Sequence, residues 1–418
     1  MTAKRTSKSP SRKSPSSKRT ATSAPLRIGV ALAGGGPLGA VYEIGALAAL
    51  EESIEGLDLN DAAIYVGISA GGLIAAGLAN GITPHDMCRM FIESDAAKSK
   101  HELFKPEILL KPAWDEFGIR AVALPVLLAD SLLHYVRHRG KASLANSLDR
   151  LKMTLPTGIL SGEGIHEFLQ KVFASGGRTN DFRKLKHRLV IVATDLDSGE
   201  PARFGRPGLD HVPISKAAQA SAAVPGLFPP VEIDGKYFVD GALKKTLHAS
   251  IALEEQVDLL FCVNPLVPYN ARTEHAPGKI AQGGLLSVLS QSLRAVIHSR
   301  VEIGMANYGV TYPGTDIVLL EPSQEDAEMF FTNLFSYNNR RRMCENAYQN
   351  TRMLLWLRRH ELDAKLARHG LRLKLSVLRD PSLSLVKTPA RDKEDRFGLA
   401  SLTDALNSLE RHLKIAAG

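Results

Sequence analysis

Cysteine is scarce in this sequence, and its three cysteines lie too far apart to define a metal or disulfide framework. Cys88, Cys262 and Cys344 form no CxxC pair, which is the spacing that zinc sites and redox motifs use. Free thiols are normal in a reducing compartment. We therefore expect no metal, no cofactor and a cytoplasmic location.

Long hydrophobic runs are also lacking. The longest apolar stretch, 121–133, is interrupted by Pro125 and Asp130, and it is shorter than the roughly 20 residues that span a bilayer. The amino terminus has no apolar run of the kind that a signal peptide needs. The sequence therefore predicts a protein that is not integral to a membrane.

Acidic residues are missing from the first 25 residues, which contain seven Lys or Arg. The formal net charge of the whole chain is +8, so these seven charges leave about +1 for the rest. Such a composition predicts a disordered basic tail over residues 1–25. The remaining chain has no excess of basic residues, which argues against specific nucleic-acid binding.

Short apolar runs alternate with helical segments from Leu26 onward. LRIGVALA (26–33), the segment 62–66 and RLVIVA (188–193) are continuous apolar runs, as in strands that are covered on both faces. Further expected strands are 236–239, 257–263 and 316–320. This alternation predicts an α/β fold with a mostly parallel central sheet.

The domain organisation follows from the same reading. We expect one catalytic domain over residues 26–322 and a helical carboxy-terminal extension over 323–418. The extension has helical spacing over 338–373 and an expected helix over 399–415. The sequence shows no repeat and does not determine the oligomeric state.

The region 97–160 is less regular, and we expect it to form a lid or an insertion. Its apolar stretch is followed by Arg137, Arg139 and Lys141, a combination that suits peripheral contact with anionic lipid surfaces. The competing interpretation is a pair of core helices with a solvated basic end.

A serine stands at a turn between an expected strand and an expected helix. Gly67-Ile68-Ser69-Ala70-Gly71 is a G-x-S-x-G pentapeptide, in which glycines leave room for a tight turn and an exposed hydroxyl. The N–H of Ala70 and the start of the helix favour a negative charge there. The pattern indicates a nucleophilic Ser69, with an ordinary glycine-rich turn as the alternative.

A glycine loop ends the preceding strand. The backbone amides of Gly34, Gly35 and Gly36 suit an oxyanion. The loop 34–39 also matches the G-x-G-x-x-G dinucleotide fingerprint. That interpretation requires an acidic residue at the end of the second strand, and the second strand here ends in Val66. The spacing favours an oxyanion loop.

Asp240-Gly241-Ala242 follows another short expected strand. A carboxylate at a strand end beside glycine can act as a base for a serine, although an ordinary turn Asp has the same sequence pattern.

Together these segments resemble the patatin-like phospholipase family, of the bacterial type, over roughly residues 26–322. The matching motifs are GGGPLG (34–39), GISAG (67–71), ATDLDSGE (193–200) and AAQASAAVPGLFPPVEIDGKYFVDGA (217–242). The resemblance implies a three-layer α/β/α fold and a serine lipid acyl hydrolase, similar to a phospholipase A or lysophospholipase, without a metal requirement.

The resemblance also implies roles for individual residues. Ser69 is expected to be the nucleophile and Asp240 the base of a dyad that forms an acyl-enzyme. Gly34, Gly35, Gly36 and Ala70 are expected to form the oxyanion hole. The sequence departs from the family pattern at Leu38, where many members have Arg or Lys, and at Lys244, Lys245 and Thr246, where many have an amide-rich stretch.

Two other functions stay open. An α/β-hydrolase triad needs a histidine late in the chain, and the candidates are His248, His298, His360, His369 and His412. A non-enzymatic lipid-binding protein would use the basic tail and the apolar stretch, but it has no chemical reason to retain both Ser69 and Asp240.

Overall fold

The computed structural model describes residues 26–92, 104–113, 156–245, 247–272, 278–331 and 337–385. Three expected features therefore lie outside the described residues. They are the basic tail, most of the expected lid (97–103 and 114–155) and the expected helix over 399–415.

A central eight-stranded sheet has the order β6-β7-β4-β3-β1-β8-β9, with β5 also paired to β4. The strands of this sheet are β1 (Ile28–Leu32), β3 (Ile64–Ile68), β4 (Arg188–Asp195), β5 (Pro201–Phe204), β6 (Val231–Ile233), β7 (Lys236–Asp240), β8 (Leu259–Val263) and β9 (Asp316–Leu320). A separate two-stranded sheet contains β2 (Ile54–Glu55) and β10 (Arg372–Leu373). β4, β3, β1, β8 and β9 are parallel, whereas β5, β6 and β7 pair antiparallel. The expected mostly parallel sheet is confirmed.

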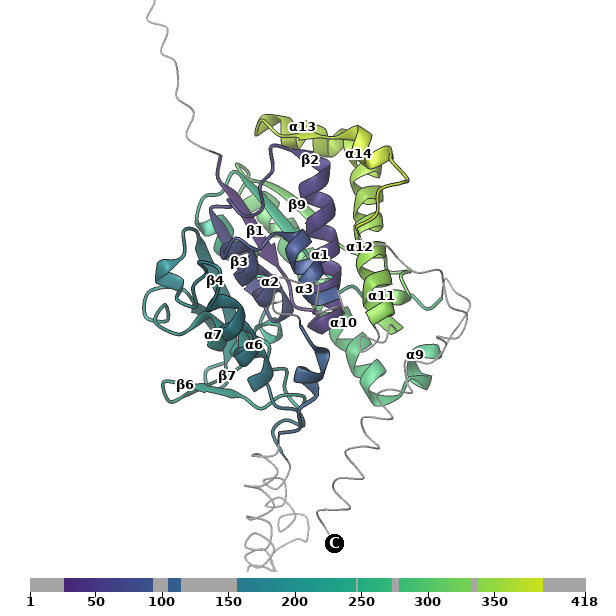
Figure 1. Ribbon diagram of the computed structural model, residues 1–418. Coiled ribbons are helices and arrows are strands. Elements are labelled where there is room, and N and C mark those ends of the chain that lie inside the picture. Colours follow the sequence, from purple (N-terminus) through teal and green to yellow (C-terminus); the bar gives the residue numbers. More distant parts are fainter. Residues whose placement is uncertain are drawn as a thin grey trace, which may run out of the picture.

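Helices cover both faces of this sheet (Figure 1). The helices are α1 (Gly36–Ser53), α2 (Ala70–Ala79), α3 (Pro84–Ile92), α6 (Glu163–Phe173), α7 (Ile214–Ser221), α8 (Ala249–Glu254), α9 (Lys279–Gln282), α10 (Gly284–Thr311), α11 (Glu328–Phe331), α12 (Tyr337–Leu357), α13 (Arg359–Arg368) and α14 (Leu375–Arg379). Short 3-10 turns are η1 (Pro106–Leu110), η3 (Phe182–Lys184) and η4 (Gly241–Leu243).

The alternating side chains of β1 belong to two separate cores, as the pleat of a strand requires. Val30 and Leu32 pack in the core that contains residues of α1, α2 and α12. Ala31 and Ala33 pack in the core that contains residues of α8 and α10. The sheet therefore lies between two helical layers, which confirms the expected three-layer α/β/α architecture.

The carboxy-terminal part of the described chain packs on the first helix. α12 lies along α1, and β10 pairs antiparallel with β2. The boundaries proposed for the catalytic domain and its extension remain predictions. No helix within the described ranges combines the length and the apolar character that crossing a membrane requires.

Candidate active site

Ser69 occupies a sharp turn between β3, which ends at Ile68, and α2, which begins at Ala70. Its backbone has φ 52° and ψ −124°, a conformation that L-residues adopt only at a cost of about 1–3 kcal/mol. Such strain is common at functional sites because the surrounding structure maintains it. The expected strand-turn-helix context of the serine is confirmed.

Two glycines allow the chain to pass close to its neighbours at this turn. A Cβ on Gly71 would lie 2.3 Å from the carbonyl oxygen of Ala33, which precedes the glycine loop. A Cβ on Gly241 would lie 2.2 Å from the carbonyl oxygen of Val192. Only glycine fits at either position, since no real Cβ approaches a backbone oxygen this closely.

The register of β4 brings Ser69 and Asp240 together. Ile68, at the end of β3, is paired with Val192, and Asp240, at the end of β7, is paired with the next residue, Ala193. β3 runs parallel to β4 and β7 runs antiparallel to it, so the carboxyl ends of both strands reach the same point of β4. The residue after Ile68 is Ser69, which therefore lies beside Asp240.

Asp240 is buried and is held through several groups. Its backbone N–H donates to the carbonyl of Ala223 at 2.9 Å, and its own carbonyl accepts from the hydroxyl of Thr194 at 3.1 Å. The N–H of Ala242 donates to Asp240 Oδ1 at 2.8 Å, and the Ser69 side chain lies close enough to the same carboxyl group to affect its pKa. The expected proximity of serine and carboxylate is therefore present.

Burial changes the acidity of this carboxyl group. It raises the pKa of Asp240 from 3.8 to about 6, while the hydrogen bond from the Ala242 N–H and the nearby Ser69 side chain lower the pKa. A higher pKa makes the carboxylate a stronger base than an exposed Asp. At neutral pH most molecules still carry the ionised form.

The glycine loop lies beside the serine, although its three glycines differ. A Cβ on Gly34 would lie 3.2 Å from Ser69 Cβ. Gly36, with φ +59°, lines the cavity at Ser69 together with Ala70. A Cβ on Gly35 would instead meet Pro265 Cγ at 2.7 Å, so the side-chain position of Gly35 faces Pro265.

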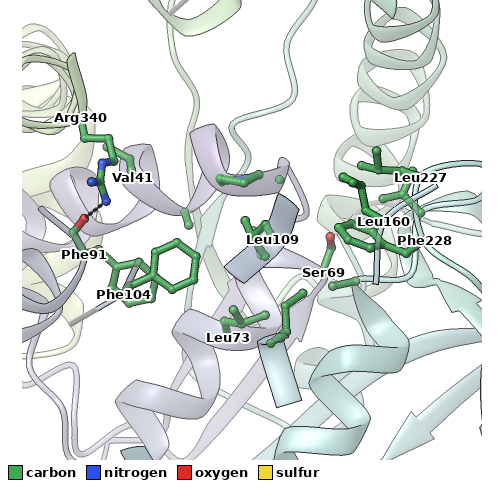
Figure 2. Close-up of a pocket in the computed structure, with 17 residues that line it drawn as sticks. Val41, Ser69, Leu73, Phe91, Phe104, Leu109, Leu160, Leu227, Phe228 and Arg340 are labelled. Carbon is green, nitrogen blue, oxygen red and sulfur yellow. Dashed lines mark hydrogen bonds between the residues drawn. The ribbon is translucent and has the colours of Figure 1, made fainter. Parts of the chain in front are cut away.

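An apolar cavity of about 300 Å³ begins at Ser69. Figure 2 shows Ser69 near Leu227 and Phe228 at one end, and Phe91 and Phe104 at the other. The remaining side chains that line it are mostly apolar and come from separate elements, including Val41, Leu73, Leu109, Leu160, Ile165 and Val224. A space of this kind accepts a hydrocarbon chain.

Residues of α3 and α12 line the far end of the cavity. Arg340 of α12 lines the cavity and donates to the carbonyl of Phe91 at 2.7 Å (Figure 2). The ring of Phe91 stacks on that of Phe104, with centroids 4.8 Å apart. These aromatic rings and the Arg340 guanidinium form the wall opposite the serine.

The candidate histidines occupy other places. His248 is buried, and burial lowers its pKa to about 3. His298 lies 3.2 Å from Gln324, and His369 lies 2.8 Å from Asp316 at the start of β9. His360 is exposed on α13, and His412 lies outside the described residues.

The residues that depart from the family pattern also have defined places. Leu38 packs against the core at the start of α1. Lys244 pairs with Glu200 at 3.1 Å, and Lys245 donates to Ser250 at 3.1 Å and lies over the Tyr308 ring. Thr246 lies outside the described residues.

Sequence analysis missed the contribution of Ser221, the last residue of α7. Its hydroxyl accepts from the backbone N–H of Ser69 at 2.7 Å and donates to the carbonyl of Val192 at 2.6 Å. The position lies inside the segment 217–242, but nothing in that segment indicates which of its residues reaches Ser69. Within the described ranges, no group of three or more His, Cys, Asp or Glu side chains could hold a metal ion.

Comparison with solved structures finds similarity to bacterial proteins. VipD from Legionella pneumophila is 18% identical over 80% of this chain and 67% of that chain, with a TM-score of 0.37. The type III effector protein ExoU is 16% identical over 80% of this chain and 53% of that chain, with a TM-score of 0.32. Full-length ExoU in complex with SpcU, from Pseudomonas aeruginosa, is 19% identical over 66% of this chain and 52% of that chain, with a TM-score of 0.26. This chain therefore spans about half the length of the ExoU chains.

Comparison with protein families gives a match over one segment of the chain. The model of the patatin-like phospholipase family matches residues 30–253, which is more than half of the 418 residues. The matched segment contains Ser69, Asp240 and the glycine loop. With this match, and with the α/β/α fold already described, the chain belongs to the patatin-like phospholipase family.

Proposed function

We propose that this protein hydrolyses acyl ester bonds of lipids, with Ser69 as nucleophile and Asp240 as general base. One observation carries the proposal. A serine that lies beside a buried carboxylate is found at one end of an apolar cavity of about 300 Å³. The cavity suits the acyl chain, and the serine is placed to attack the carbonyl carbon at its end.

The first half of the reaction forms an acyl-enzyme. Ser69 Oγ attacks the ester carbonyl carbon while its proton moves to the Asp240 carboxylate. The negative charge that develops on the carbonyl oxygen is stabilised by the Ala70 N–H, the amides of Gly34 to Gly36 and the amino end of α2. The C–O bond then breaks, and the leaving alcohol oxygen takes the proton from Asp240.

The second half of the reaction regenerates the enzyme. A water molecule gives a proton to Asp240 and attacks the acyl carbon, and the tetrahedral intermediate expels Ser69 Oγ, which takes that proton back. The products are a fatty acid and the free serine. Histidine has no part in these proposed steps, because burial lowers the pKa of His248 to about 3, which makes its imidazole a weak base.

Labelling with a serine-reactive fluorophosphonate tests the nucleophile. We expect the wild-type protein to be labelled at Ser69 and to release fatty acid from phospholipid or lysophospholipid, and Ser69→Ala to do neither. Ser53→Ala removes another buried serine hydroxyl, at the far end of α1, and should behave as the wild type. Near-wild-type hydrolysis by purified, folded Ser69→Ala would show that another residue is the nucleophile.

The same experiment separates the alternatives. A wild-type protein that binds lipid but is neither labelled nor active would be the non-enzymatic lipid-binding protein. Lipid profiling of the products would identify the headgroup and the acyl position that the enzyme prefers.

A further inference from the structure

We infer that Ser221 is a positioning residue for the proposed reaction, and that its side chain holds the backbone of Ser69 in the conformation that attack requires. The inference rests on the proposed function, since it assigns the support of the same nucleophile. It is based on two short hydrogen bonds and on complete burial: Ser221 is 0% exposed.

The Ser221 hydroxyl lies between two backbone groups at the end of the β3–β4 pairing. Ile68 is the last residue of β3 in register with β4, opposite Val192. At the next residue the chain turns away, with φ 52° at Ser69. The hydroxyl accepts from Ser69 N–H at 2.7 Å and donates to Val192 O at 2.6 Å.

Both backbone groups are buried and need partners. Because the chain bends away from β4 at Ser69, the Ser221 hydroxyl bridges the two backbone groups. It accepts a hydrogen bond from Ser69 N–H and donates one to the Val192 carbonyl. A hydroxyl is one of the few side-chain groups that can do both at a single atom. The two backbone groups at the bend that exposes Ser69 Oγ to the cavity are therefore both hydrogen-bonded.

The residues that follow Ser221 extend the same support to the base. Ala222 lines the same cavity as Ser69, and the carbonyl of Ala223 accepts a hydrogen bond from the backbone N–H of Asp240 at 2.9 Å. Three consecutive residues at the end of α7 therefore contact the nucleophile, the cavity and the base. Their contacts fix the position of Ser69 relative to Asp240.

Ser221→Ala removes the bridging oxygen and leaves the cavity lining intact. We expect kcat for a lipid ester to fall about 10- to 100-fold, the scale of effect that a small misplacement of reacting groups produces. The KM should stay within about twofold, because no group that contacts the acyl chain changes. The rate of labelling by fluorophosphonate should fall in parallel, since labelling requires the same attack geometry.

Ser215→Ala is the matched control. Ser215 is also a fully buried serine of α7, and its hydroxyl accepts from Asn180 at 2.8 Å, away from the site. Both variants lose one buried hydroxyl, so a purely structural role predicts similar losses of thermal stability and unchanged kcat for both. We expect reduced kcat and labelling only for Ser221→Ala, with recovery in Ser221→Thr, which restores the hydroxyl.

The outcomes separate this inference from the proposed function. The inference alone is overturned if the wild type is labelled normally and folded Ser221→Ala keeps the wild-type kcat and the wild-type labelling rate. Absence of wild-type labelling at Ser69 overturns the proposed function and the inference with it. If Ser221→Ala does not fold, Ser221→Cys takes its place, because it keeps the volume and weakens both hydrogen bonds. Reduced kcat in Ser221→Cys supports the inference, and wild-type kcat overturns it.

Discussion

At the residue scale, the protonation state of Asp240 controls the proposed chemistry. Burial raises its pKa to about 6, so the carboxylate is available as a base only above that pH. We expect kcat/KM of the wild-type enzyme to rise with pH through an apparent pKa near 6. Asp240→Asn, which keeps the shape and removes the base, should lower kcat by roughly 100-fold or more and abolish this pH dependence.

The control for this prediction is His248→Gln. Because burial lowers the pKa of His248 to about 3, its titration cannot produce a step in activity near pH 6. The variant should retain the acid limb of the profile. Loss of turnover in His248→Gln, together with near-normal turnover in Asp240→Asn, would replace the dyad by a histidine mechanism.

The same carboxyl group makes a pH-dependent contribution to stability. Its folded-state pKa of about 6 lies above the ordinary value of 3.8, so the contribution is fully present below pH 3.8 and is lost as the pH rises through 6. The shift corresponds to about 3 kcal/mol. The free energy of unfolding of Asp240→Asn, relative to the wild type, should therefore increase from pH 4 to pH 8. Urea denaturation at both pH values measures it, and a difference that does not vary with pH would contradict the assigned burial effect.

At the element scale, α2 has two roles in the candidate site. Its amino end carries Ser69, and Leu73, one turn later, lines the cavity. Residues four apart lie on the same face of a helix, so Leu73 lies along the path from Ser69 toward Phe91 and Phe104 (Figure 2). The size of the side chain at position 73 should therefore limit the length of acyl chain that can bind.

Two substitutions at this position test the prediction. Leu73→Phe should lower kcat/KM for a long-chain ester by roughly 10-fold or more and leave a short-chain ester nearly unaffected, because each methylene kept out of the cavity loses about 0.8 kcal/mol. Leu73→Ala should not lower kcat/KM for the long-chain ester relative to the short-chain ester. Kinetics with butyryl and palmitoyl esters measure both effects. Equal losses on the two esters in Leu73→Phe would place the acyl chain elsewhere.

The meeting of β3 and β7 on β4 is also a property of elements. The sequence of each strand alone indicates only where that strand ends, and not which other strand ends beside it. β5 pairs with the other edge of β4 over the same residues, so β3 and β7 share one edge and their carboxyl ends approach each other. The serine and the carboxylate come together because of this strand order.

At the scale of the whole molecule, the cavity depends on residues outside the family match. Residues 30–253 include most of its lining, but Arg340 comes from α12, which lies along α1. On the same side of α12, Cys344 Sγ lies 4.0 Å from Cys88 Sγ of α3. α12 therefore contributes one residue to the cavity wall and contacts α3.

Whether lipid hydrolysis depends on a metal ion is also a property of the whole molecule. The described part of the chain contains no cluster of three or more side chains suited to a metal ion, and each proposed step uses only Ser69, Asp240 and backbone amides. We expect lipid hydrolysis to persist in excess EDTA. Reversible loss of activity on chelation, restored by calcium, would contradict this mechanism.

Several properties of the whole chain remain predictions from the sequence. The predicted lipid contact of the 97–160 region and the predicted disorder of the basic tail concern segments that lie largely outside the described residues. The predicted cytoplasmic location is a property that only experiments in the cell can test. Sedimentation with anionic liposomes, for wild type and for Arg137→Glu/Arg139→Glu/Lys141→Glu, tests the lipid contact.

Local sequence determined the central elements and the position of the nucleophile. Apolar runs such as 188–193 can be buried on both faces only as central strands, and G-x-S-x-G between a strand and a helix has few structural solutions. The expected segments agree with β1, β3, β4, β8 and β9 to within two or three residues. Short elements with weak patterns, such as β5 and β6, and the long α10 were not predicted, because their burial depends on the elements that cover them.

Only the tertiary structure decided how the site is assembled. Asp240 gains its basicity from burial, and its place beside Ser69 comes from adjacent register positions on β4. Ser221 reaches Ser69 across 152 positions of sequence. Burial, strand register and contacts between distant segments depend on how the whole chain packs, and no local pattern of residue types encodes them.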